Sequence, residues 1–141
     1  MARRCGANVM NTESLAAIYT DSLLDDLFPP ERTDRFFDAL FGDAEEGAYD
    51  IRLRFLSADS GKNTLFFEFQ LLQRPGKCLA CNLTHGLPEV FSRHPAINVK
   101  KLSEQLATRL GDGKTCASWK LGATRQHSAD RYAVPLEIRI Q

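Results

Sequence analysis

Two cysteines and two histidines in the middle of the chain are the residues whose types and spacing best suit chemistry. Cys78 and Cys81 stand in a CxxC spacing, and His85 and His94 follow them. Thiolates and imidazoles are ligands that zinc prefers, so these four residues are a candidate metal site. A single CxxC lacks the second pair that makes such spacing specific. Zinc or thiol-dependent chemistry at Cys78, Cys81 and a histidine is therefore an alternative interpretation and not the leading one.

The local pattern predicts that the two cysteines lie on a strand. Residues 78–84 read as extended chain, and residues three apart on a strand point to opposite faces of the sheet. Cys81 would then share the core face with Leu79 and Leu83. Cys78 would face outward, whereas a thioredoxin-like CxxC opens a helix. We therefore expect structural cysteines that stay reduced, as is usual in a cytoplasm.

Nucleophilic catalysis is a weaker alternative for the same residue types. Cys78 or Cys116 would need a histidine base, which His85, His94 or His127 would have to supply. No local signature orients such a base or builds an oxyanion hole. The GxGxxG, GxxxxGK and HExxH motifs are also absent from the sequence. The sequence therefore favours a non-catalytic protein without a cofactor.

Charge is sorted along the chain. The first fifty residues hold eleven Asp and Glu against four Lys and Arg, and the remainder holds seven against fourteen. Asp21, Asp25 and Asp26 crowd the C-terminal half of the first expected helix, where mutual repulsion and the helix dipole both oppose them. They are candidate partner-binding residues. The alternative is that solvent, or basic side chains of this same chain, compensate them.

Four basic residues are expected on the solvent-facing side of the sheet, and we take them as further candidates for partner binding: Arg52, Arg54, Lys120 and Arg139. Glu68 and Glu137 fall on the same side. Sheets that read RNA also present stacking aromatic residues, and here only Phe66 is available. Weak RNA binding is thus a third interpretation, and nucleic acid is not the expected partner.

The elements that position these residues begin with an acidic helical hairpin over residues 10–43. Apolar residues recur every three or four positions over residues 12–28, which predicts one helix that ends at Pro29 and Pro30. A second helix is expected over residues 30–41, with Gly42 at its exit. Its buried side would consist of Phe36, Phe37, Leu40 and Phe41.

Residues 48–141 are expected to form a sheet with one crossover helix. Period-two patterns predict five strands: from residue 49 to about 55, then 65–72, 78–84, 115–123 and 131–140. A short helical piece at 89–93 and a longer helix that starts at Asn98 separate the third strand from the fourth. Pro135 suggests that the last strand lies at an edge, or is paired on one side at that point. The order ααβββαββ indicates an α+β two-layer sandwich with a one-sided antiparallel sheet.

Length and composition complete the expectation. With 141 residues, the chain fits a disordered tail over residues 1–9 and a single α+β domain over 10–141. No signal peptide is evident, and no apolar run approaches a membrane span. The leading interpretation is a small, non-catalytic, cytoplasmic protein-binding or adaptor module, acting through its acidic helices or its sheet face. Its partner would be an unidentified protein or a second copy of the chain.

Overall fold

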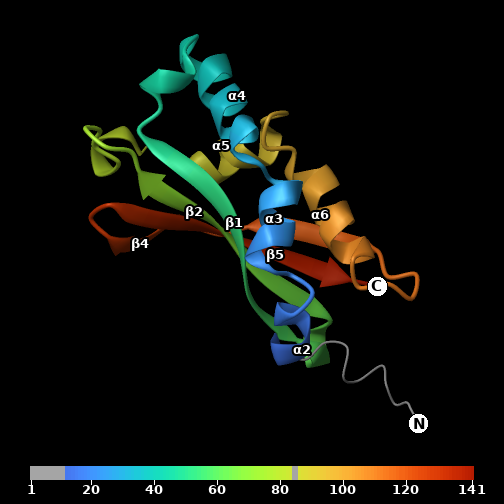
Figure 1. Ribbon diagram of the computed structural model, residues 1–141. Helices are drawn as coiled ribbons and strands as arrows, with labels where there is room; N and C mark the ends of the chain where they lie inside the picture. Colours follow the sequence, from blue (N-terminus) through green and yellow to red (C-terminus); the bar gives the residue numbers. More distant parts are fainter. Residues whose placement is uncertain (1–11, 84–85) are drawn as a thin grey trace.

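A five-stranded antiparallel sheet forms one layer of the fold, and helices pack on one of its faces (Figure 1). The computed structural model describes residues 12–83 and 86–141. The strands lie in the order β1, β2, β5, β3, and β4 pairs with β5. Their bounds are Tyr49–Asp59 (β1), Thr64–Gln73 (β2), Cys116–Leu121 (β3), Arg125–Ser128 (β4) and Arg131–Ile140 (β5). The predicted α+β class and antiparallel sheet are confirmed.

The helices fall into two groups along the chain, before β1 and between β2 and β3. They are α2 (Thr12–Ala16), α3 (Asp21–Leu27), α4 (Pro30–Phe41), α5 (Leu87–Arg93) and α6 (Val99–Thr108), with 3-10 turns η1 (Ala44–Glu46), η2 (Ser60–Lys62) and η3 (Ala80–Asn82). None of the helices in the described part of the chain combines the length and apolar character needed to cross a lipid bilayer. The predicted tail, residues 1–9, lies outside the described residues.

Aromatic side chains join the sheet to the helices. The alternation along β2 is confirmed, because Leu65, Phe67, Phe69 and Leu71 are fully buried. Phe69 meets Phe28 and Phe91 edge-to-face, with ring centroids 5.5 and 5.7 Å apart. Edge-to-face contact suits the quadrupole of aromatic rings and adds to the apolar area that each ring buries.

The first predicted helix is broken into two. Thr20 begins α3, because its side chain accepts a hydrogen bond from the Leu23 N–H at 3.2 Å. The break places Tyr19 in the core, where its hydroxyl donates to the Leu106 carbonyl at 2.6 Å. A long-range hydrogen bond and a local cap therefore outweigh the continuous apolar stripe.

The helix α4 has the predicted ends but a narrower buried side. Phe36 and Phe37 are buried, whereas Leu40 and Phe41 are 46% and 55% exposed. Both exposed residues lie in the last turn, before Gly42 leaves the helix at φ 77°. The ring of Phe41 stacks on Phe37 and does not enter the core, so the prediction was wrong for these two positions.

The third predicted strand is absent, and residues 78–82 form a tight turn with η3 instead. Gly76 has φ 74°, and the Gln73 side chain then accepts a hydrogen bond from the Leu79 N–H at 3.0 Å. That N–H is no longer free for a strand ladder. The fifth strand is instead the short β4, which pairs with β5 in a hairpin that extends at the left of Figure 1.

Of the two alternatives for the last strand, the edge position was wrong, because β5 lies between β2 on one side and β3 and β4 on the other. The other alternative is confirmed, because Pro135 has a ladder partner in β2 and none in β3 or β4. Pro135 is tolerated there because of its place along the strand. Residues 136–140 pair with β3 and residues 131–133 with β4, so Pro135 falls where the partner changes. Its carbonyl still accepts from the Gly122 N–H at 2.9 Å.

Side chains of this chain cover the outer edge of β1. The Thr33 hydroxyl of α4 bonds the N–H and the carbonyl of Ile51, and the Thr12 hydroxyl does the same at Ala58. An uncovered edge strand is a template for pairing with another chain. The helices thus occupy an edge at which a foreign strand would otherwise add.

Candidate functional site

The sheet side that faces away from the helices is the main candidate for a binding surface, and we refer to it as the open face. Phe66, Glu68 and Gln70 of β2 point to this side, because their neighbours Phe67 and Phe69 point into the core. Strand pairing places further side chains beside them: Arg52, Lys120, Arg125, Arg131, Pro135, Glu137 and Arg139.

A hollow of about 430 Å³ lies on the open face. Its apolar floor comes from Leu56, Phe66 and Pro135, and its charged rim includes Lys120 and Arg125. Leu56 is 45% exposed, since it is the extra residue of a bulge between Phe55 and Ser57. The bulge therefore adds a third apolar side chain to the floor that Phe66 and Pro135 begin.

The acidic groups of the open face are already engaged within the chain. Glu68 is only 7% exposed and accepts from the Gln70 amide at 2.8 Å, with the His127 imidazole 3.5 Å away. Glu137 pairs with Lys120 at 3.0 Å. Within the described ranges, no carboxylate pairs with four exposed arginines of this face: Arg52, Arg125, Arg131 and Arg139. The face therefore presents uncompensated positive charge.

Two of the predicted acidic residues have partners inside the chain. Asp21 and Asp25 of α3 pair with Arg54 of β1 at 3.3 and 2.9 Å. The Arg54 side chain is 15% exposed and also donates to its neighbour's carbonyl, that of Leu53, at 2.8 Å. Unlike Arg52, Arg54 thus faces the acidic helix and leaves the open face. The structure favours the alternative in which this chain compensates its own acidic cluster.

Asp26, the third acidic candidate, lies apart from that pair. It lines a shallow polar hollow of about 310 Å³ with Arg32, Arg35 and Lys101. Arg32 is held there by backbone carbonyls, with Nη1 donating to Leu27 at 2.8 Å and Nε to Ala96 at 3.1 Å. Burial, and then the nearby Arg35, lower the Arg32 pKa. The arginine thus joins the end of α3 to the segment before α6.

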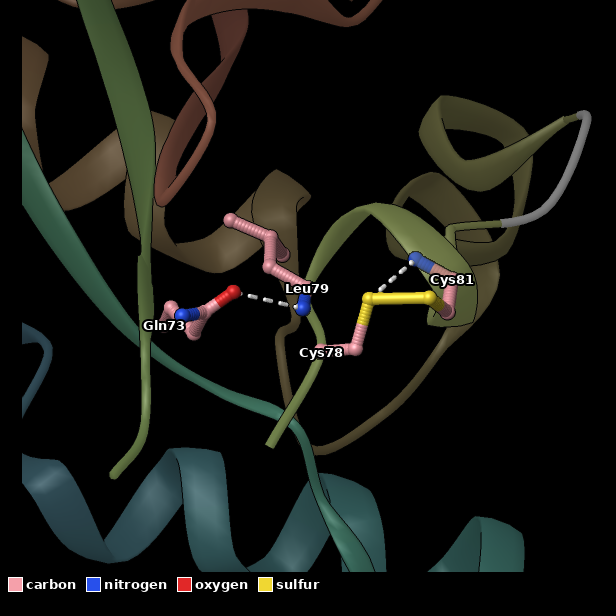
Figure 2. Close-up of a disulfide and its surroundings, with 4 residues drawn as sticks. All are labelled: Gln73, Cys78, Leu79 and Cys81. Atoms are coloured by element: carbon pink, nitrogen blue, oxygen red, sulfur yellow. Dashed lines mark hydrogen bonds between the residues drawn. A yellow bond between two sulfur atoms is a disulfide. The ribbon is translucent and has the colours of Figure 1, made fainter. Parts of the chain in front are cut away.

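Cys78 and Cys81 form a disulfide (Figure 2), so two of the predictions for these cysteines were wrong. They are not reduced, and Cys81 is exposed rather than part of the core face. Cys78 faces outward as expected. The reason is the turn after β2, which brings residues three apart together, where a strand would hold them on opposite faces. The CxxC therefore lies in a helical turn, which brings its two cysteines together. The strand prediction had placed them on opposite faces of the sheet.

The histidines do not complete a metal site with these cysteines in the described residues. Nδ1 of His94 accepts from the Ala96 N–H at 3.1 Å, and its ring packs edge-on against Phe36. Burial lowers the pKa of His94. His85 lies outside the described residues. No group of three His, Cys, Asp or Glu side chains in residues 12–83 and 86–141 is arranged to hold a metal ion.

Cys116, the other cysteine considered as a nucleophile, is half-buried at the start of β3. Burial raises the pKa of its thiol, and Glu104 raises it further. A thiol that is neutral and partly covered is a poor nucleophile. The environment therefore gives no support to catalysis at Cys116.

Comparison with protein families, with curated proteins and with solved structures finds no match to this chain. Its function must be argued from its own residues.

Sequence reasoning missed four residues that shape these sites. Arg131 has the same parity on β5 as Arg139, so the alternation of that strand could have placed it on the open face. Arg125 lies on β4, whose four residues carry no alternating pattern that would identify a strand. Leu56 reaches the open face through a bulge, which periodicity does not reveal. Gln73 captures the Leu79 N–H and so defines the cysteine turn. Only the Pro75–Gly76 turn signal beside it was visible in the sequence.

Proposed function

We propose that the open face of the protein is a binding surface that takes an acidic segment of another protein. The supporting observation is the apolar hollow at Leu56 and Phe66, set in a face whose exposed arginines have no carboxylate partner within the described ranges. The floor would accept an aliphatic or aromatic side chain, and the arginines its flanking carboxylates. The proposal keeps the cytoplasmic location expected from the sequence.

The composition of the face favours a protein over RNA as the partner. Stacking of bases needs aromatic platforms, and Phe66 is the one aromatic residue in the hollow that points to this side. Glu68 and Glu137 lie within the same surface and would repel a continuous phosphate backbone. A peptide can place isolated carboxylates opposite the arginines and avoid both acids.

The open face is also favoured over the acidic helices. Asp21 and Asp25 are already paired with Arg54, so a cationic partner would have to displace an existing contact. An acidic partner could contact Arg52 and Arg125 without displacing an ion pair of the described residues. We therefore assign partner binding to the sheet and not to α3.

The test is a selection of 12-residue peptides from a display library by the intact protein, followed by fluorescence anisotropy of the enriched peptides. We expect peptides with an apolar residue between Asp or Glu residues. The double variant Arg52→Glu with Arg125→Glu should weaken binding about 10- to 100-fold, because each surface contact of about 0.2–1 kcal/mol turns from attraction to repulsion. Arg109→Glu is the matched control, since this exposed arginine belongs to the helical side.

Two outcomes would overturn the proposal. One is enrichment of peptides whose affinity does not change in the double variant. The other is tighter binding of a labelled oligouridine than of any selected peptide, which would favour the RNA interpretation. Sedimentation velocity on the intact protein adds a third arm, because dimerisation abolished by the double variant would make the partner a second copy.

A further inference from the structure

The turn that carries Cys78 and Cys81 is held in place by contacts that do not depend on the bond between their sulfurs. Leu79, which lies between them, is fully buried in the core. Its N–H donates to the Gln73 side chain at 3.0 Å (Figure 2). Both cysteines are exposed. The scaffold would thus keep the two sulfurs adjacent and accessible after reduction.

The two sulfurs are not equivalent. The backbone N–H of Cys81 donates to Sγ of Cys78 at 3.2 Å, as the dashed line in Figure 2 marks. A hydrogen bond to a thiolate stabilises the charged form, and the thiolate is the nucleophile in disulfide exchange. This contact therefore favours Cys78 as the attacking sulfur of the reduced pair.

The bridge is also a poor candidate for a structural staple. It joins residues only three apart, and the loop entropy that a disulfide removes from the unfolded chain grows with loop length. A bridge between distant elements would stabilise the fold more. A short loop, two exposed sulfurs and a preformed turn instead suit a bond that opens and closes.

We propose that Cys78 and Cys81 form a reversible dithiol–disulfide exchange site, with solvent-accessible disulfides as the substrate class and a dithiol reductant as co-reactant. The Cys78 thiolate attacks one substrate sulfur, and the other substrate sulfur leaves as a thiolate and takes a proton from solvent. Cys81 then loses its proton and attacks Sγ of Cys78, which releases the second substrate thiol. The substrate disulfide gains the two electrons that the pair loses, and the dithiol reductant later returns two electrons to the pair.

The first experiment compares the two sulfurs one at a time in the full chain, with Cys5→Ser and Cys116→Ser as background. Cys81→Ser leaves Cys78, and Cys78→Ser leaves Cys81. Reaction with 5,5′-dithiobis(2-nitrobenzoic acid) is followed between pH 5 and 9. We expect Cys78 to ionise about one pH unit below Cys81 and to react about 3-fold faster at pH 7. A chain that keeps Cys116 alone is the matched control and should react more slowly than both, because that thiol is half-buried.

The second experiment equilibrates the same background, with both cysteines of the pair intact, in mixtures of reduced and oxidised glutathione. Alkylation and mass spectrometry then give the oxidised fraction, and circular dichroism reports the fold. We expect both redox states to be populated and the spectrum to be unchanged. Equal ionisation of the two sulfurs, a pair that stays oxidised in every mixture, or unfolding on reduction would each overturn the proposal. One Zn²⁺ bound per reduced chain in native mass spectrometry would replace it with the zinc interpretation.

Discussion

Replacement of Arg74 by methionine should destabilise the protein by about 3 kcal/mol. The side chain of Arg74, directly after β2, is only 16% exposed, and its guanidinium connects three segments that are separate in sequence. It donates to the carbonyl of Ala44 at 2.8 Å and to the carboxylates of Asp34 and Asp50 at 3.3 and 3.0 Å. It also lies over the Phe37 ring, 5.4 Å from the centroid.

The magnitude follows from these contacts. A charge-assisted bond to a carbonyl contributes about 1.5 kcal/mol. The two ion pairs contribute about 0.5 kcal/mol each, because the Asp34 and Asp50 side chains are both 57% exposed. The contact with the Phe37 ring adds roughly 0.5 kcal/mol. Methionine keeps an unbranched apolar stem and removes all four interactions.

Urea denaturation followed by circular dichroism measures the effect. With a slope of about 1.5 kcal/mol per M, the midpoint of the Arg74→Met variant should fall by about 2 M. The midpoint of the Arg74→Lys variant should fall by an intermediate amount, since one ammonium group cannot donate to acceptors that lie in several directions. Lys77→Met, at an exposed position of the same turn, should stay within about 0.5 kcal/mol of the wild type. An Arg74→Met variant as stable as this control would refute the reasoning.

Three further predictions concern the core and its titratable groups. Gly47→Ala should lower the free energy of unfolding by about 2 kcal/mol in thermal unfolding, because a Cβ would lie 2.2 Å from the Phe37 ring. Gly61→Ala is the control and should be nearly neutral, because the nearest atom to its Cβ would be 3.4 Å away. Equal losses of stability in the two variants would contradict the packing argument. Burial raises the pKa of Tyr19, so the unfolded chain loses its proton first and stability should decline as pH rises above about 10. Tyr19→Phe should lower the free energy of unfolding by about 1 kcal/mol at pH 8. Urea denaturation should show a smaller loss of stability between pH 8 and pH 11 in this variant than in the wild type, and an equal loss would exclude Tyr19 as its source. Burial lowers the pKa of His94, so the unfolded chain binds the proton first and stability should fall as pH drops below about 6.5. His94→Gln should reduce this loss of stability between pH 7.5 and 5.5. If the variant loses as much stability as the wild type over this range, other groups cause the loss.

Patterns within one element were predictable from the sequence, whereas contacts between elements were not. The alternation of β2 and the ends of α4 follow from periodicity, proline and glycine, which act locally. The break before α3 depends on the Tyr19 hydroxyl reaching α6, 87 residues away. No pattern around Tyr19 indicates such a partner.

The candidate sites divide in the same way. Arg52 and Arg139 were placed on the correct side of the sheet by parity alone. Arg54 has the same parity, but it turns to Asp21 and Asp25, because ion pairing decides where a long side chain goes. The cysteine turn depends on one hydrogen bond to the side-chain amide of Gln73. The residue types between Gln73 and Leu79 do not indicate that bond.

The central place of β5 has a consequence for synthesis of the chain. A ribosome makes β1 and β2 early, and these two can pair as soon as they emerge. The other edge of β2 must then wait for residues 131–140, which are made last among the strands. During that interval the nascent chain exposes unpaired backbone groups beside Phe67 and Phe69, the kind of surface that recruits holding chaperones. Translation pauses in the segment between β2 and β5 should therefore reduce yield more than pauses before β1.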